Sequence, residues 1–144
     1  MDSEKILAQL RRFLLIISAG IFVMTVSELF FLAHWNVTIQ FLPFALCALG
    51  LVAMALAYFR PSRRTIRFTQ WSMIFITICS FIGFYEHMSS NFWFWLDIQP
   101  NATTWELVKA TFTGGTPILA PGILTLGGVI GATALYKHPS LETK

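Results

Sequence analysis

The stretch "FLPFALCALGLVAMALAYF", residues 41–59, decides the fold because it contains no charged side chain from end to end. An α-helix needs roughly 17 to 25 mainly apolar residues to cross a hydrocarbon core about 30 Å thick, and this stretch meets that requirement. A helix buried in a water-soluble bundle would instead carry a polar face on its outer side. The stretch therefore predicts a transmembrane helix.

The rest of the chain repeats this pattern. Apart from the charged residues that end two of them, the other apolar windows contain a single charged residue, Glu28. The chain is 56% hydrophobic and 12% charged, whereas soluble domains carry roughly 25% charged residues. We predict an all-α membrane protein with one domain, residues 1–144, built as an antiparallel up-down bundle of four transmembrane helices. The helices are expected at residues 13–33, 41–59, 68–86 and 117–137.

The first of these windows is longer than the 7 to 15 apolar residues of a secretory signal peptide. It is also interrupted by Glu28 and lacks a clear small-residue cleavage site. We therefore expect the first helix to be retained.

Basic residues predict the orientation, because nine of the ten fall on one side of the expected bundle. Only Lys109 lies on the other side. Basic residues favour the cytoplasmic side of a membrane, so both termini and the link "RPSRR" are expected there, in the bacterial inner membrane. Orientation in the lipid bilayer therefore explains the net positive charge, and no nucleic-acid partner is expected. The nine are Lys5, Arg11, Arg12, Arg60, Arg63, Arg64, Arg67, Lys137 and Lys144.

The long outer loop is expected to carry structure of its own. It opens with "NFWFWLDIQPN", an aromatic cluster typical of the headgroup region, where amphipathic rings are favoured. Thr103 and Glu106 then have the spacing of a capping box. Trp105, Val108 and Phe112 follow on one helical face, which predicts an amphipathic helix at residues 104–112. It would lie on the outer membrane surface or over the mouth of the bundle.

The last expected helix contains two opposing signals. Thr116 as N-cap and Pro117 at the first helical position favour a helix start, and Pro121 one turn later predicts a kink. Further along, small residues have GxxxG spacing, which lets a neighbouring helix approach closely in lipid. We expect these residues to pack helices together, within this bundle or against a partner: Gly127, Gly128, Gly131 and Ala132.

Candidate chemistry is confined to the expected outer side, where Glu28, His34, Glu86 and His87 lie near two helix ends. Two histidines and two carboxylates suit zinc, copper or iron by ligand type, but their spacing matches no known metal motif. No catalytic, P-loop or dinucleotide motif is present. We therefore expect no enzyme activity, no cofactor and no metal, with these four residues as the only metal candidates.

Glu28 stands out because of its depth, about 10 Å of helix rise below Trp35. A carboxylate placed near the bilayer centre is disfavoured by up to about 3 kcal/mol. We expect its side chain to point into the bundle and to find a hydrogen-bond partner there.

Four segments, "SELFFLAHW", "RPSRR", "YEH" and "GGTPILAPGILTLGG", together resemble small four-helix bacterial membrane proteins of no assigned activity. The resemblance extends over most of the chain and implies the four-helix fold. It implies no activity, and no functional residue is carried over from it.

Three functions remain open at this stage. The first is a non-enzymatic accessory or assembly subunit of a larger membrane complex, with other membrane proteins or a second copy as partners. The second is a protein with an outer-side metal, quinone or lipid-headgroup site built around Glu28, His34, Glu86 and His87. The third is an ion or proton pathway through Glu28.

The orientation is testable with topology reporters. Reporters fused after Lys144 and inserted in the link between Arg60 and Arg67 should both report the cytoplasm, because basic residues favour that side. The measurement is the activity ratio of paired cytoplasmic and periplasmic reporters. An external signal at either position would contradict the predicted orientation.

Overall fold

The computed structural model describes residues 2–142, and every regular element in that range is helical. This confirms the all-α expectation. The C-terminal Lys144, one of the basic residues expected on the cytoplasmic side, lies outside the described residues. The elements are α1 (Ser3–Phe31), the 3₁₀ turn η1 (Thr38–Phe41), α2 (Leu42–Phe59), α3 (Arg63–Ile98), α4 (Thr104–Thr113), α5 (Ala120–Ala134) and the 3₁₀ turn η2 (Pro139–Leu141).

Three helical stretches within residues 2–142 are long and apolar enough to cross a membrane. They are α1, the continuous stretch Thr38–Phe59 and α3. The last helix, α5, has 15 residues, or about 22 Å of helix, and is shorter than the expected 117–137. Its late start is explained by Pro121, which lies in the first turn of α5, where its missing N–H is not needed. It therefore starts the helix instead of kinking it.

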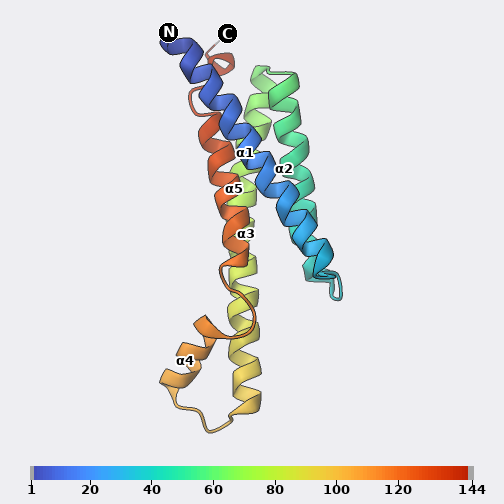
Figure 1. Ribbon diagram of the computed structural model, residues 1–144, viewed down its shortest axis with the longest axis vertical. Coiled ribbons are helices and arrows are strands. Elements are labelled where there is room, and N and C mark those ends of the chain that lie inside the picture. The colour runs from blue at the N-terminus through green and yellow to red at the C-terminus, as the bar shows by residue number, and fades with distance from the viewer. Residues whose placement is uncertain (1, 143–144) are drawn as a thin grey trace.

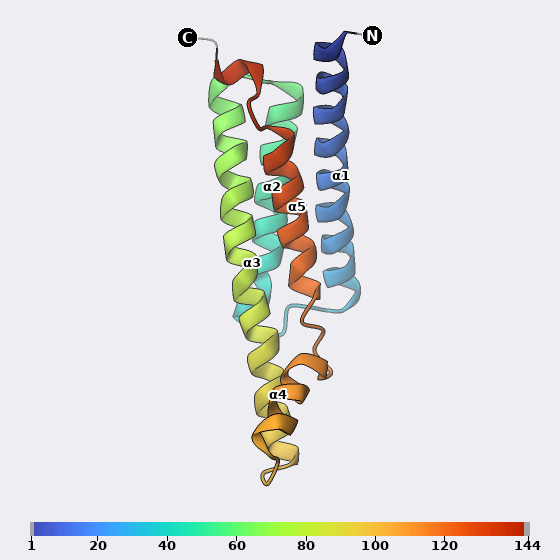
Figure 2. The ribbon, with the colours of Figure 1, turned by 90° about the vertical axis from the view of Figure 1, so that its left-hand side faces the viewer.

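Four helices, α1, α2, α3 and α5, lie side by side (Figure 2). Figure 1 shows the start of α1, the α2–α3 link and the end of α5 together at one end of the molecule. The last helix, α5, packs mainly on α1 and α3, and α2 packs on the same two helices. Contacts between α2 and α5 are far fewer, so these two helices occupy diagonal positions.

The centre of the bundle is the ring of Phe22 on α1, which is 0% exposed. Glycines on two neighbouring helices pack against this ring. A Cβ atom added to Gly50 of α2 would lie 2.9 Å from this ring, and one added to Gly127 of α5 would lie 3.2 Å from it. The absence of side chains at these two positions makes room for the ring, and Phe22 thereby links three helices.

Glycines on the inner face of α5 allow a similarly close approach to α3. A Cβ at Gly128 would lie 2.9 Å from the carbonyl oxygen of Met73 and would also collide with Thr77. A Cβ at Gly131 would lie 2.6 Å from the sulfur of Met73. The structure thus places the glycines of the GxxxG pattern in contacts with this chain's own helices. Ala132, the fourth member, is partly buried and packs against the core.

Hydroxyl groups add hydrogen bonds between the helices. Ser18 Oγ of α1 donates to the Gly127 carbonyl of α5 at 2.7 Å, and Thr69 Oγ1 of α3 donates to the Ala53 carbonyl of α2 at 2.7 Å. The hydroxyls of Ser80 and Thr125 join α3 to α5. Polar groups in a lipid environment need such partners within the protein, and these bonds fix the register of the helices.

The third helix is longer than the expected 68–86. It has 36 residues, which is about 54 Å of helix. A reciprocal cap between Ser62 and Thr65 starts it, and Pro100 lies two residues after its last residue, Ile98. The expected end at residue 86 follows from the fall in hydropathy after Tyr85. However, "MSSNFWFWLDI" contains no glycine or proline, so nothing in it stops the helix.

The glycine contacts predict the effect of a bulky side chain. Gly128→Leu should lower stability by about 1–3 kcal/mol, the usual cost of forcing extra volume into a packed interior, because the carbonyl of Met73 is backbone and cannot rotate away. The measurement is thermal melting in detergent. The matched control is Gly20→Leu on α1, since a Cβ at Gly20 meets nothing within 4 Å. Equal melting of both variants would contradict the close approach of α5 to α3.

Candidate functional site

A helical hairpin made by the end of α3 and by α4 projects from the bundle (Figure 1). Among the helices of residues 2–142, α4 contacts α3 alone. It buries Ala110. The capping box that starts α4 is confirmed: Thr103 N–H donates to Glu106 Oε2 at 2.7 Å, and Glu106 N–H donates to Thr103 Oγ1. The helix does not lie over the mouth of the bundle, one of its two expected places.

Large apolar side chains are exposed on both helices of this hairpin. The expected apolar face of α4 points away from α3, and its Trp105 is 73% exposed. On α3, Phe94 and Ile98 are four residues apart and therefore share a face. We call this set the hairpin patch. Its members are Trp93, Phe94, Ile98, Trp105, Val108 and Phe112.

The side chain of Asn91 holds the hairpin to the loop that returns to α5. It is 3% exposed. Its Nδ2 donates to the carbonyl oxygens of Thr111 at 3.2 Å and Thr116 at 2.8 Å, and its Oδ1 accepts from the Thr116 N–H at 2.9 Å. Gly114 lies against this amide, since a Cβ there would come within 2.5 Å of Asn91 Cγ. One buried amide therefore satisfies three backbone groups, one in the last turn of α4 and two in the loop.

This role of Asn91 was not foreseen. In the sequence it is only the first residue of the outer-loop stretch "NFWFWLDIQPN". Its one signal was an asparagine inside an otherwise aromatic run, but the run was expected to be a loop. Thr116, expected as the N-cap of the last helix, instead pairs with Asn91.

The structure brings His34 and His87 close enough to interact electrostatically. His34 follows α1 in the turn where Ala33 has a φ of 47°, and His87 belongs to α3. Burial lowers the pKa of His34, and the charge of His87 lowers it further. His87 Nδ1 lies 2.7 Å from the Pro117 carbonyl oxygen. A carbonyl only accepts, so Nδ1 carries the proton and, in the neutral ring, Nε2 is left as the acceptor.

The carboxylates do not join this pair. Glu28 and Glu86 are exposed, and neither carboxylate makes a hydrogen bond or ion pair within the described residues. No group of three or more His, Cys, Asp or Glu side chains within residues 2–142 is placed to hold a metal ion. The histidines therefore form a pair without the expected carboxylates.

The expectation that Glu28 points into the bundle is wrong. The last buried residue of α1 is Thr25, so α1 leaves the core about one turn before Glu28. Val26 and Leu29, on either side of Glu28, are partly buried, whereas Glu28 itself is exposed, so its side chain lies off the packed face of α1. The carboxylate consequently lies on the surface of the bundle.

No family model, curated protein or solved structure matches the chain. The class is therefore defined by the fold alone. The described residues form an all-helical protein with three helices long and apolar enough to span a membrane. A helical hairpin with exposed aromatic side chains projects from one end.

The loop contacts predict a specific effect for Asn91→Leu. This change leaves three backbone groups of Thr111 and Thr116 without partners, which should cost about 1–3 kcal/mol. Faster hydrogen exchange at the Thr116 amide and a lower melting temperature would report the loss. The control is Asn101→Leu, because Asn101 is exposed and makes no hydrogen bond within residues 2–142. Unchanged exchange at Thr116 in Asn91→Leu would show that the amide does not hold the loop.

The histidine pair predicts how stability depends on pH. The pKa of His34 is lower in the folded protein than in the unfolded chain, so acid favours the unfolded chain. The contribution of His34 is present above its unfolded pKa of about 6.5 and is lost as pH falls through the folded pKa. His34→Gln should therefore flatten the fall in melting temperature between about pH 7 and 5. The measurement is melting in detergent across that range, and identical profiles for both proteins would contradict the lowered pKa of His34.

Proposed function

We propose that this protein is a non-enzymatic accessory or assembly subunit that binds a larger membrane complex through the hairpin patch. It has four transmembrane helices, α1, α2, α3 and α5, in an antiparallel up-down bundle of the bacterial inner membrane. Both termini and the arginine link face the cytoplasm, and the hairpin faces outward. The observation that carries the proposal is the exposure of large apolar side chains on both helices of a projecting hairpin.

The four-span arrangement is supported by the position of the chain ends. The described ends of the chain lie at the same end of the bundle (Figure 1), which requires an even number of crossings. The fourth crossing is α5 with its flanking turns, since residues 116–136 carry no charge. Three crossings would place the basic residues after α5 on the opposite side from the arginine link, against the basic-residue rule.

The outward position of the hairpin is supported by helix length. From Arg67, where the apolar part of α3 begins, to Ile98, the helix rises about 47 Å, whereas the hydrocarbon core is about 30 Å thick. About 17 Å of α3 therefore extends past the hydrocarbon core, and α4 packs on this part. Headgroup contact accounts for the aromatic rings nearest the membrane, but not for those further along the hairpin.

The apolar surface itself supports a protein partner. Several large apolar side chains are exposed on this one hairpin, and tryptophan is among the residues enriched at positions that dominate binding energy. A partner with an apolar outer-side surface would cover Trp93 and Trp105.

The test is purification in mild detergent from the native membrane. The wild-type protein should retain a membrane partner in fixed stoichiometry, and Trp93→Ser/Trp105→Ser should lose it, because these rings are exposed and their loss leaves the fold intact. The matched control is Phe31→Ser/Phe59→Ser, which removes two exposed rings outside the hairpin. Retention of the partner by the hairpin variant would contradict the proposal.

The same preparation tests the rival function. Metal analysis and an absorption spectrum would reveal a bound metal or quinone. A stoichiometric metal or chromophore lost in His34→Gln or His87→Gln, with no protein partner, would replace the accessory role with a binding site at the histidine pair.

A further inference from the structure

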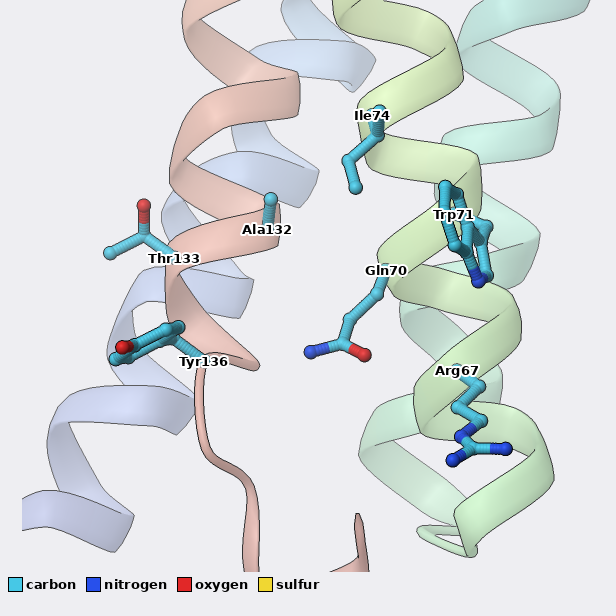
Figure 3. Close-up of a pocket in the computed structure, with 7 residues that line it drawn as sticks. All are labelled: Arg67, Gln70, Trp71, Ile74, Ala132, Thr133 and Tyr136. Atoms are coloured by element: carbon cyan, nitrogen blue, oxygen red, sulfur yellow. The ribbon is translucent and has the colours of Figure 1, made fainter.

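A groove of about 690 Å³ runs between α3 and α5 at the end of the molecule opposite to the hairpin. Its volume is within the roughly 300–1,000 Å³ of small-molecule sites. Figure 3 shows Arg67, Gln70, Trp71 and Ile74 on one side and Thr133 and Tyr136 on the other. The α3 residues have spacings of three and four, so they share one helical face.

The groove exists because of small side chains and one polar contact. Ala132 on α5 gives it a shallow wall. Gln70 extends from α3 toward α5 (Figure 3), and its Nε2 donates to the Leu135 carbonyl at 3.0 Å. This contact holds the end of α5 against α3 and fixes the width of the groove, so the shape is built by the fold itself.

The two ends of the groove differ in chemistry. Trp71 is 70% exposed and lies with Ile74 in the apolar part of α3, where a hydrocarbon chain would contact them. Arg67 lies one turn before Trp71, directly before the apolar window that opens at Phe68. Tyr136 is 67% exposed and lies just after the last residue of α5. The groove therefore runs from the headgroup level into the hydrocarbon level of a bilayer.

The positive charge at the headgroup end of the groove has no negatively charged partner among the described residues. The Arg67 guanidinium makes no hydrogen bond and no ion pair within residues 2–142. A guanidinium binds phosphate oxygens in bidentate geometry, and basic residues at this level attract anionic lipids. The missing partner is therefore an anion at the membrane surface.

We propose that this groove binds one anionic phospholipid, with its phosphate on Arg67 and an acyl chain along Trp71 and Ile74. The site lies on the opposite end from the hairpin patch, so the lipid and the protein partner occupy separate surfaces.

The experiment compares retention of phosphatidylglycerol and phosphatidylcholine with identical acyl chains by native mass spectrometry of the full chain in detergent. The wild-type protein should retain phosphatidylglycerol preferentially. Arg67→Gln should reduce this retention about fivefold, the contribution of one arginine near an anionic surface. Arg64→Gln is the matched control and should change it little, because Arg64 does not line the groove.

A second pair of variants tests the apolar part. Thr133→Trp places a large ring in the groove from an exposed position and should displace the lipid, whereas Val129→Trp, one turn earlier on α5 and outside the groove, should not. Equal retention of both lipids, equal effects of Arg67→Gln and Arg64→Gln, or lipid retained by Thr133→Trp would each overturn the proposal. Glycerol phosphate without acyl chains should fail to compete, and effective competition would mean a soluble phosphate ligand instead.

Discussion

The close approach of α5 to α1 and α3 is the constraint on which the rest of the bundle depends. Lipid is as apolar as the helix surfaces, so helices in a bilayer gain little from apolar burial and associate through close packing and hydrogen bonds. Here Gly127 and Gly131 bring the α5 backbone against Phe22, Met73 and Ser18. The Ser18 hydroxyl then reaches the Gly127 carbonyl, a bond that the missing side chain makes possible.

This packing also determines where the functional surfaces lie. With α5 starting at Ala120 and α3 continuing to Ile98, the two helices end at different levels. The unequal lengths leave the end of α3 without a bundle neighbour, and α4 covers one side of it. The buried amide of Asn91 then ties the returning loop to α3. At the other end, the contact of Gln70 with Leu135 holds α5 and shapes the groove.

The sequence predicts those features that depend on local chemistry. Uncharged windows such as residues 41–59 predict apolar helices, and Thr103 with Glu106 predicts the start of α4 because a capping box is formed by residues three apart. Features that depend on neighbouring elements cannot be predicted from local sequence. The exposure of Glu28 depends on which face α1 turns toward its neighbouring helices, and the first residue of α5 depends on whether Pro117 or Pro121 lies in its first turn. Hydropathy locates the apolar part of α3 but not its end, because loss of apolar character does not terminate a helix.

The most direct test of the central claim is a disulfide between α3 and α5 in the membrane. Ser80→Cys/Thr125→Cys, in a protein with Cys47 and Cys79 replaced by alanine, puts thiols where the two hydroxyls lie 2.5 Å apart, close enough for a bond. The account predicts rapid intramolecular cross-linking, and none for Ser80→Cys/Leu126→Cys, because Leu126 is exposed on α5. Cross-linking only between two copies, or equal cross-linking of both pairs, would show that α5 does not pack on α3 of its own chain.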